Sequence, residues 1–191
     1  NYNSIRMIKN TVLLSLYSIL WTFPIPIILA LLINQVKWKK FQRVSQTILY
    51  APHFISTMIL CGMLRIFLSP YGGLISTIIQ AFGGKATNLI DSATAFRTIY
   101  ISSSVWQDAG WGTIIYIATL SSVDASLHEA ARVDGATPLQ RIFYIDIPEL
   151  IPVIVIQLIM SFGNLMNVGF EKAYLLQTSL NKATSEIIAT Y

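Results

Sequence analysis

The chain has 191 residues, of which 54% are hydrophobic and only 12% are charged. Ordinary soluble domains carry roughly 25% charged residues, so this composition argues against a soluble domain with a fully charged surface. The net charge of +4 does not indicate nucleic-acid binding, because four of the 13 basic residues lie in one short loop, and a single cysteine provides no disulfide framework.

Long stretches without charge are the strongest feature of the sequence. Residues 10–36, 44–64 and 150–170 contain no aspartate, glutamate, lysine or arginine. About 20 apolar residues in a helix cross the roughly 30 Å hydrocarbon core of a bilayer. The sequence therefore predicts an all-α, polytopic transmembrane helical bundle.

In chain order, the first predicted span covers residues 11–33 and contains Pro24 and Pro26. Prolines in the middle of a helix predict a kink, which membrane helices tolerate when neighbours satisfy the freed carbonyls. The second span covers residues 44–67, with His53 near its start. We interpret His53 as a hydrogen-bonded structural or interfacial residue rather than a ligand.

A loop around Pro70 and a short interfacial helix follow the second span. The third span covers residues 98–123 and the fourth covers 150–170, with a polar segment at 124–149 between them. A loop from Glu171 leads to a fifth span that begins at about residue 185. Because the chain starts at Asn1 and stops in an apolar segment, we expect residues 1–191 to be one transmembrane domain within a longer subunit.

The distribution of positive charge in short loops predicts the orientation in the membrane. Residues 37–43 contain three lysines and one arginine without an acid, so this loop is predicted to be cytoplasmic. Alternation then places the Pro70 loop outside, the segment 124–149 inside and the tail outside. Arg6, Lys9, Lys172 and Lys182 are exceptions, since they fall on the outer side.

The segment 124–149 is predicted to form two short helices with a sharp turn between them. Ser126 with Glu129 three residues later is a capping-box pattern that starts the first helix. Gly135 can adopt the left-handed conformation that ends it. Thr137 then caps the second helix, with a proline at its first position and Gln140 completing another capping box.

This segment resembles the EAA loop of type I ATP-binding-cassette (ABC) importer permeases. The family pattern is Glu-Ala-Ala, three residues, glycine, nine residues, and Ile-x-Leu-Pro. The chain has Glu-Ala-Ala at 129–131, Gly135 and Ile-Asp-Ile-Pro at 145–148, so Ile147 replaces the leucine. Flanking residues, including 132–137, are similar to the sugar-transporting branch. The whole chain resembles permeases for complex oligosaccharides, including pectin and uronate fragments.

The resemblance implies a maltose-permease-like fold and a multi-pass subunit of the bacterial cell membrane, the inner membrane in a two-membrane cell. It implies that the first helix of the loop docks into a separate ATPase and couples its closure to the membrane helices. The residues that would carry this coupling are Glu129, Ala130, Ala131, Asp134 and Gly135.

The implied partners are a homologous second permease, in a heterodimer, two ABC ATPase subunits and an extracellular or periplasmic solute-binding protein. The chain is also expected to contact membrane lipid and an oligosaccharide substrate, and it is not expected to bind nucleic acid. The chain contains no Gly-x-x-x-x-Gly-Lys-Ser/Thr phosphate loop. We therefore expect it to bind no cofactor or metal and to have no catalytic residue, with ATP and Mg²⁺ held by the ATPase partners.

Polar residues within the spans are candidates for a substrate pathway, because they are costly in lipid and usually face a cavity. When the sequences are aligned without gaps from the EAA loop, the sugar-contacting positions of maltose-type permeases correspond to Gln107, Asp108, Trp111, Ser161, Leu165 and Val168. Two of these positions are apolar here. The candidates are Trp106, Gln107, Asp108, Trp111, Ser161, Asn164 and Asn167.

A structural role for the same residues stays open. The serine and asparagines could join helices by hydrogen bonds, and Trp106 and Trp111 could be interfacial anchors. An acidic Asp108 fits poorly with an anionic uronate, so Asp108 could instead pair with Arg97 or with a residue of a partner subunit.

Three other functions remain as alternatives at this point. Asp108 and the proline-broken first span would suit a secondary transporter driven by an ion gradient. A permease for a non-sugar solute would keep the ABC mechanism with different cargo. A membrane-embedded enzyme is disfavoured, because His53 and His128 fall in different membrane regions and no metal-ligand spacing is present.

Overall fold

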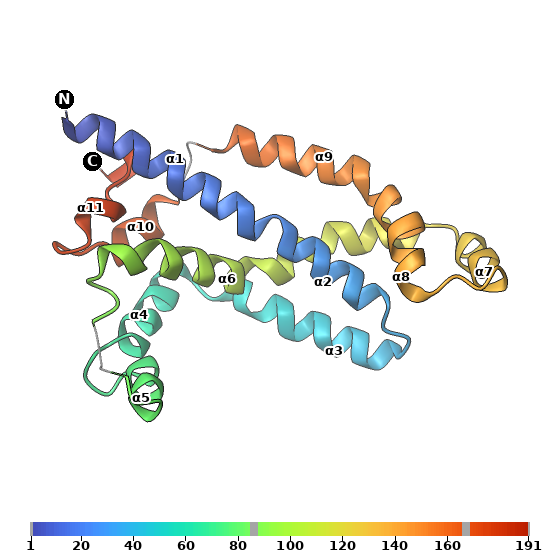
Figure 1. Cartoon of the computed structure of the whole chain (residues 1–191), viewed down its shortest axis with the longest axis horizontal. Coiled ribbons are helices and arrows are strands. Elements are labelled where there is room, and N and C mark those ends of the chain that lie inside the picture. The colour runs from blue at the N-terminus through green and yellow to red at the C-terminus, as the bar shows by residue number, and fades with distance from the viewer. Residues whose placement is uncertain (1, 85–87, 166–168, 191) are drawn as a thin grey trace. The chain divides into compact units, whose positions relative to one another are not determined.

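The computed structural model describes residues 2–84, 88–165 and 169–190, and all regular structure within them is helical (Figure 1). The elements in chain order are α1 (Tyr2–Thr22), α2 (Pro24–Asn34), α3 (Lys39–Tyr50), η1 (Ala51–Phe54), α4 (Thr57–Phe67), α5 (Leu74–Ala81), α6 (Ala93–Ser122), α7 (Ala125–Val133), α8 (Pro138–Arg141), η2 (Ile142–Asp146), α9 (Ile147–Gly163), α10 (Phe170–Leu176), α11 (Lys182–Ser185) and η3 (Ile188–Thr190). This confirms the predicted all-α class. The segments η1 and η3 are 3₁₀-helices, and η2 is a π-helix.

The chain divides into two compact units. Unit 1 consists of Asn1–Ile19, Ile55–Ser104 and Asn164–Tyr191, and unit 2 consists of Leu20–Phe54 and Val105–Gly163. Unit 2 contains both segments predicted to be cytoplasmic, residues 37–43 and 124–149. Unit 1 contains the segments predicted to lie outside: the start of the chain, the Pro70 loop and the tail.

The core of unit 2 forms where α2, α6 and α9 meet. Ala30, Tyr116, Leu120 and Leu150 are buried together there. The partly buried residues packed against them are Ile27, Leu31, Ile117, Val153 and Ile154. Because lipid is as apolar as these side chains, close van der Waals packing must hold such helices together in a membrane.

Two glycines of α6 permit this close packing. A Cβ added at Gly110 would lie 1.9 Å from the Leu49 carbonyl oxygen of α3, and one added at Gly112 would lie 3.0 Å from a ring carbon of Pro26 in α2. Small residues let helix backbones approach to distances that larger side chains exclude. The two glycines therefore fix how α6 packs against α2 and α3 within unit 2.

The first predicted span has the interruption that its prolines suggested. Helix α1 ends at Thr22, and α2 begins at Pro24 after the single residue Phe23. Proline has no N–H to continue the helical ladder but suits the first position of a new helix. The break therefore lies immediately before the first of the two prolines.

The second predicted span, residues 44–67, is divided among α3, η1 and α4 rather than forming one helix. Pro52 lies in the 3₁₀ turn, where its missing N–H removes a helical hydrogen bond. Ser56 then caps α4, because its hydroxyl oxygen accepts a hydrogen bond from the Ile59 N–H at 3.4 Å.

Two helices in the described residues are long and apolar enough to cross a membrane, Ser4–Asn34 and Pro138–Gly163, and the interrupted pair Lys39–Phe54 and Thr57–Phe67 would make a third. Helix α6, which contains the predicted third span, has 30 residues and so extends about 45 Å. Arg97, Asp108 and several serines lower its hydropathy. Helix α6 is therefore not among the two or three candidate membrane spans, and the four predicted spans with their boundaries stay predictions.

The predicted helix after Thr137 runs without interruption into the fourth predicted span. Helix α8 passes through the π-helix η2 into α9, which ends at Gly163. Pro148 cannot donate a backbone hydrogen bond to the preceding turn, and a wider π-turn placed just before it accommodates that loss. Asp146 is the last residue of this π-helix, and its side chain is fully buried.

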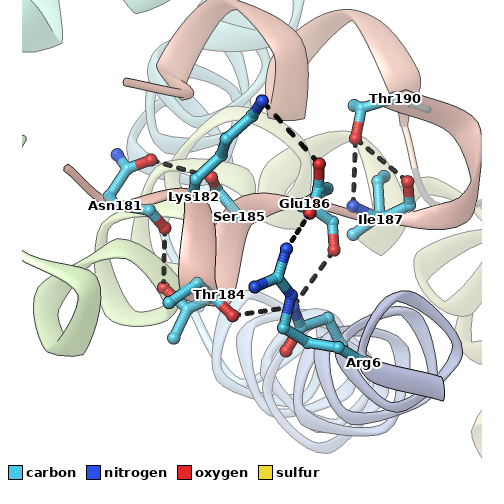
Figure 2. Close-up of polar contacts among 10 residues, drawn as sticks. Arg6, Asn181, Lys182, Thr184, Ser185, Glu186, Ile187 and Thr190 are labelled. Atoms are coloured by element: carbon cyan, nitrogen blue, oxygen red, sulfur yellow. Dashed lines mark hydrogen bonds and ion pairs between the residues drawn. The ribbon is translucent and has the colours of Figure 1, made fainter. Parts of the chain in front are cut away.

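Within unit 1, polar side chains join the beginning of the chain to its tail. Asn10 donates from Nδ2 to the carbonyls of Ala183 (2.9 Å) and Glu186 (3.1 Å) and accepts from Arg97 Nη2 at 3.0 Å. Figure 2 shows Arg6 meeting the Glu186 carboxylate, which Lys182 also approaches. Polar groups of α1 and α6 thus hold the segment 181–188 in place.

Candidate functional site

The first helix of the predicted coupling loop is α7, and Asp124 caps it. The Asp124 carboxylate accepts a hydrogen bond from the Ser126 backbone N–H at 2.9 Å. The predicted capping box of Ser126 and Glu129 is therefore wrong, and the helix cap lies two residues earlier, at Asp124. Hydrogen bonds from Ser126, first from its backbone and then from its side chain, hold the pKa of Asp124 below its ordinary value. The cap is complete at neutral pH and weakens as pH falls through that lowered pKa.

The turn after α7 has the predicted geometry. Gly135 has φ +79°, and the backbone N–H groups of Gly135 and Ala136 donate to the carbonyls of Arg132 (3.1 Å) and Ala131 (2.8 Å). This pair of bonds is a Schellman motif, which closes a helix around a left-handed residue. Thr137 and Gln140 then form the predicted capping box at the start of α8.

The residues predicted to couple the subunit to an ATPase lie on an open surface. Glu129, Ala130, Asp134 and Gly135 are exposed, and Ala131 is partly exposed. Among the described residues Glu129 makes no ion pair. Large apolar side chains beside them also face outward, with Val133 88% and Leu127 48% exposed. A short helix that exposes apolar side chains and a carboxylate without an ion-pair partner can bind another protein.

A buried carboxylate connects α7 to the membrane helices. Asp146 is fully buried in η2, where its Oδ2 accepts from Gln35 Nε2 at 3.0 Å and its Oδ1 lies 3.3 Å from His128 Nε2. His128 precedes Glu129 on α7, and Gln35 follows α2. Movement of α7 would therefore pull on both α2 and the start of α9. Sequence reasoning missed this cluster, because its members are 18 and 111 residues from Asp146 and form no local pattern.

Replacing Asp146 with leucine should destabilise the subunit by about 2 kcal/mol, because Gln35 would lose its buried acceptor and His128 its 3.3 Å contact with the carboxylate. Asp146→Asn keeps an acceptor oxygen for Gln35 and should therefore reduce the stability of the subunit clearly less than Asp146→Leu. Thermal unfolding of the assembled complex in detergent measures both. An Asp146→Leu variant as stable as the parent would contradict the anchoring role.

The candidate pathway residue Asp108 has a partner within unit 2. Asp108 Oδ1 lies 2.9 Å from His53 Nδ1, and the His53 ring stacks on Trp111 with centroids 4.5 Å apart. Arg97 instead donates to Asn10, so the suggested pairing of Asp108 with Arg97 is wrong. The hydrogen-bonded interpretation of His53 is confirmed, and Asp108, His53 and Trp111 form one cluster.

The other candidates have different surroundings. Trp106 is half exposed, whereas Gln107 is buried on α6. Ser161 donates to the Gln157 carbonyl at 2.8 Å and lines a pocket of about 200 Å³ with Gly112 and Tyr116. Ligand sites generally have about 300–1,000 Å³, so this pocket is small for an oligosaccharide.

The candidate positions after α9 lie outside this pocket. Asn164 is exposed, and the carbonyl of Leu165 accepts a hydrogen bond from the Ser15 hydroxyl. Asn167 and Val168 lie outside the described residues.

In the described part of the chain, no three histidine, cysteine, aspartate or glutamate residues come together as a possible metal site. The Asp108–His53 pair contains only two such groups. The described residues thus contain an exposed helix, α7, a buried carboxylate that links it to α2 and the start of α9, and the cluster of Asp108, His53 and Trp111.

Comparison with known proteins gives a consistent result. Residues 4–188 match the family model described as "Binding-protein-dependent transport system inner membrane component". The chain is 40% identical over 185 residues to the polygalacturonan/rhamnogalacturonan transport system permease protein YteP of Bacillus subtilis (strain 168), covering 97% of the chain and 58% of YteP. It is 36% identical over 191 residues to protein LplB of the same organism, covering 100% of the chain and 60% of LplB.

A solved structure is also similar. The crystal structure of a bacterial ABC transporter involved in the import of the acidic polysaccharide alginate contains a chain with 42% identity and a TM-score of 0.95. The match covers 98% of this chain and 65% of that one. The present chain thus spans less than two thirds of the length of each of these relatives.

Proposed function

The chain belongs to the family of binding-protein-dependent transport system inner membrane components, and from that premise we propose that it is the pore-forming permease subunit of an ABC importer for oligosaccharides. A second, homologous permease would complete the pore in the cell membrane. Two separate ATPase subunits would drive it, and a solute-binding protein would deliver the sugar.

The observation that carries this proposal is the exposed helix α7. Glu129 and its apolar neighbours have no covering partner among the described residues, although Asp124, the Schellman turn and the capping box hold their backbone rigidly. Rigidity matters because a flexible loop would absorb the movement of an ATPase instead of transmitting it. The Asp146 cluster offers a route from α7 to α2 and α9.

In this mechanism the chain itself makes and breaks no covalent bond. ATP and Mg²⁺ would bind to the ATPase partners, since the 191 residues contain no phosphate loop. Closure of the ATPases around ATP would push the two α7 helices, and the connected membrane helices would change the pore from inward-facing to outward-facing. A related importer has been solved with an alginate pentasaccharide-bound periplasmic protein, which supports delivery of the sugar by such a partner.

Oligosaccharide cargo is supported by the relatives, whose names include polygalacturonan, rhamnogalacturonan and alginate. Transport driven by an ion gradient is not favoured, because the family depends on a binding protein. Asp108, which that alternative would need as a coupling residue, already pairs with His53. A phosphorylated small solute is the cargo alternative, since the chain is 32% identical to an sn-glycerol-3-phosphate permease over 125 residues.

Reconstitution of the full-length subunit with its partner permease, ATPase and binding protein in liposomes tests this function. We expect labelled oligosaccharides to accumulate only when ATP is supplied with the ATPases. A matched complex whose ATPase lacks its phosphate-loop lysine should show background uptake. Accumulation driven by a proton gradient without ATP would contradict the proposal, and uptake of glycerol 3-phosphate alone would contradict the cargo.

A further inference from the structure

Unit 1 carries the whole net positive charge of the chain. The residue ranges of unit 1 contain seven basic and three acidic side chains, a net charge of +4, whereas those of unit 2 contain six of each and are neutral. The predicted orientation places the loops of unit 1 outside the cell, opposite to the usual preference of lysine and arginine for the cytoplasmic side. Such an excess suggests a role other than orientation, and attraction of an anionic solute is one such role.

A cleft of about 750 Å³ lies within unit 1 and includes two of these charges. It is formed by α4, α10 and the segment leading into α11, and we call it the basic cleft. Its lining residues are Met58, Cys61, Gly62, Arg65, Tyr174, Leu175, Gln177, Thr178, Ser179 and Lys182. The volume falls within the range of about 300–1,000 Å³ that is typical of small-molecule sites.

Arg65 is held in a fixed position at the wall of the basic cleft. Its Nε and Nη2 both donate to the Leu175 carbonyl, at 3.2 and 2.6 Å. Among the described residues no carboxylate forms an ion pair with it. The guanidinium therefore keeps its full charge and further N–H donors, in the planar arrangement that suits a carboxylate.

Lys182 provides the second charge. Its Nζ lies 3.9 Å from Glu186 Oε1, a long contact, while Oε2 of the same carboxylate meets Arg6 directly (Figure 2). Arg6 and Lys182 thus share one carboxylate, and the three side chains together carry a net charge of +1. The backbone under Lys182 is fixed, because fully buried Asn181 donates to the carbonyls of Ile90 (2.9 Å) and Leu176 (3.0 Å).

The remaining walls have the chemistry of a sugar site. Thr178 and Ser179 offer hydroxyl groups, and the ring of Tyr174 is well exposed for stacking on a pyranose. Gln177 Nε2 is a buried donor with no hydrogen-bond partner among the described residues. A neutral ligand would leave the charge of Arg65 without a counter-ion, whereas a uronate offers a carboxylate to the cations and hydroxyl groups to the polar side chains.

We propose that the basic cleft binds an acidic oligosaccharide, with Arg65 and Lys182 holding a uronate carboxylate. This rests on the proposed function for its place in import, but binding itself can be measured separately. The cleft also explains how a subunit with an acidic Asp108 can accept an anionic sugar, since the carboxylate of Asp108 is engaged by His53 in unit 2 while the cations lie in unit 1.

The test measures binding of trigalacturonate and of its fully methyl-esterified form to the complete permease–ATPase complex in lipid nanodiscs, without binding protein. Lys182→Gln and Arg65→Gln should each raise the Kd for the acid about tenfold, the effect of losing one charge-assisted hydrogen bond. Neither should alter binding of the ester. Raising the salt concentration should weaken binding of the acid only.

Lys9→Gln is the matched control, because Lys9 is an exposed cation of unit 1 outside the cleft and its replacement should leave both affinities unchanged. Lys182→Arg, which keeps the charge, should restore affinity for the acid. Unchanged affinity in the two cleft variants overturns the proposal. Equal losses for acid and ester, or an equal loss in Lys9→Gln, also overturn it, since they would indicate a structural effect.

Uptake by the same complexes, with binding protein added, separates this proposal from the proposed function. Lys182-dependent binding without ATP-driven accumulation would retain the basic cleft and contradict the importer function. ATP-driven accumulation of trigalacturonate that is identical in wild type and Lys182→Gln, together with unchanged binding, would retain the importer and overturn the cleft.

Discussion

Replacing Glu129 with arginine is expected to reduce ATP-driven transport to background while leaving the subunit inserted in the membrane. Glu129 is exposed on α7 and makes no ion pair among the described residues, so its loss should not disturb the fold. At a contact with an ATPase the arginine would place the opposite charge in a desolvating interface, where an unpaired charge costs several kcal/mol. Uptake in liposomes and co-purification of the ATPase measure the effect.

The matched control for this charge reversal is Glu149→Arg. Glu149 is also an exposed acid of the segment 124–149, but it lies on α9 and not on the docking helix. We expect the Glu149→Arg complex to retain its ATPase and most of its transport, and Glu129→Gln to fall between the two. Full transport by Glu129→Arg, or an equal loss in Glu149→Arg, would refute a docking role for α7.

Replacing Gly110 with valine should prevent stable folding of the subunit. The first added carbon would lie 1.9 Å from the Leu49 carbonyl oxygen and 2.4 Å from its carbon, both backbone atoms that no rotamer change can move. Overpacking of a core typically costs 1–3 kcal/mol, and a clash with backbone belongs at or above the top of that range, about 3 kcal/mol or more. Loss of monodisperse protein after detergent extraction, or a strongly lowered Tm, is the expected result.

Gly62→Ala provides the comparison for Gly110. Gly62 lies in the interior of α4, and an added Cβ there has nothing within 4 Å. Alanine favours helix over glycine by about 1 kcal/mol, so Gly62→Ala should leave the Tm unchanged or raise it. If Gly110→Val were as stable as Gly62→Ala, α6 would not pack against α3 as described.

Local patterns were sufficient to predict most of the backbone structure of the segment 124–149. A glycine followed by Thr-Pro-x-Gln can close one helix and open the next using only neighbouring groups, and Gly135, Thr137 and Gln140 do so here. The same reasoning chose Ser126 instead of Asp124 as the first cap. Aspartate and serine are both common N-cap residues, so the sequence alone does not choose between them. In the structure Asp124 has the extended backbone of an N-cap, whereas Ser126 already lies within α7.

The long-range partners of the candidate residues could not be found in the same way. His53 and Asp108 are 55 positions apart, and Asp146 meets Gln35 across 111 positions. No periodicity connects such distant residues, so the sequence suggested Arg97 or a partner subunit for Asp108 instead of His53, and it gave Asp146 no role of its own. The interruption at Phe23, by contrast, was predictable because proline acts on its own turn.

By itself, the sequence determined that the chain is an apolar helical bundle and that its loop 124–149 has the form of a family of transport subunits, because hydrophobic length, capping and turn residues act over a few neighbouring positions. Only the tertiary structure decided which charges are paired, where Gly110 must be small, and that Arg65 and Lys182 share a cleft. Those features depend on contacts between segments far apart in the chain, which packing alone brings together.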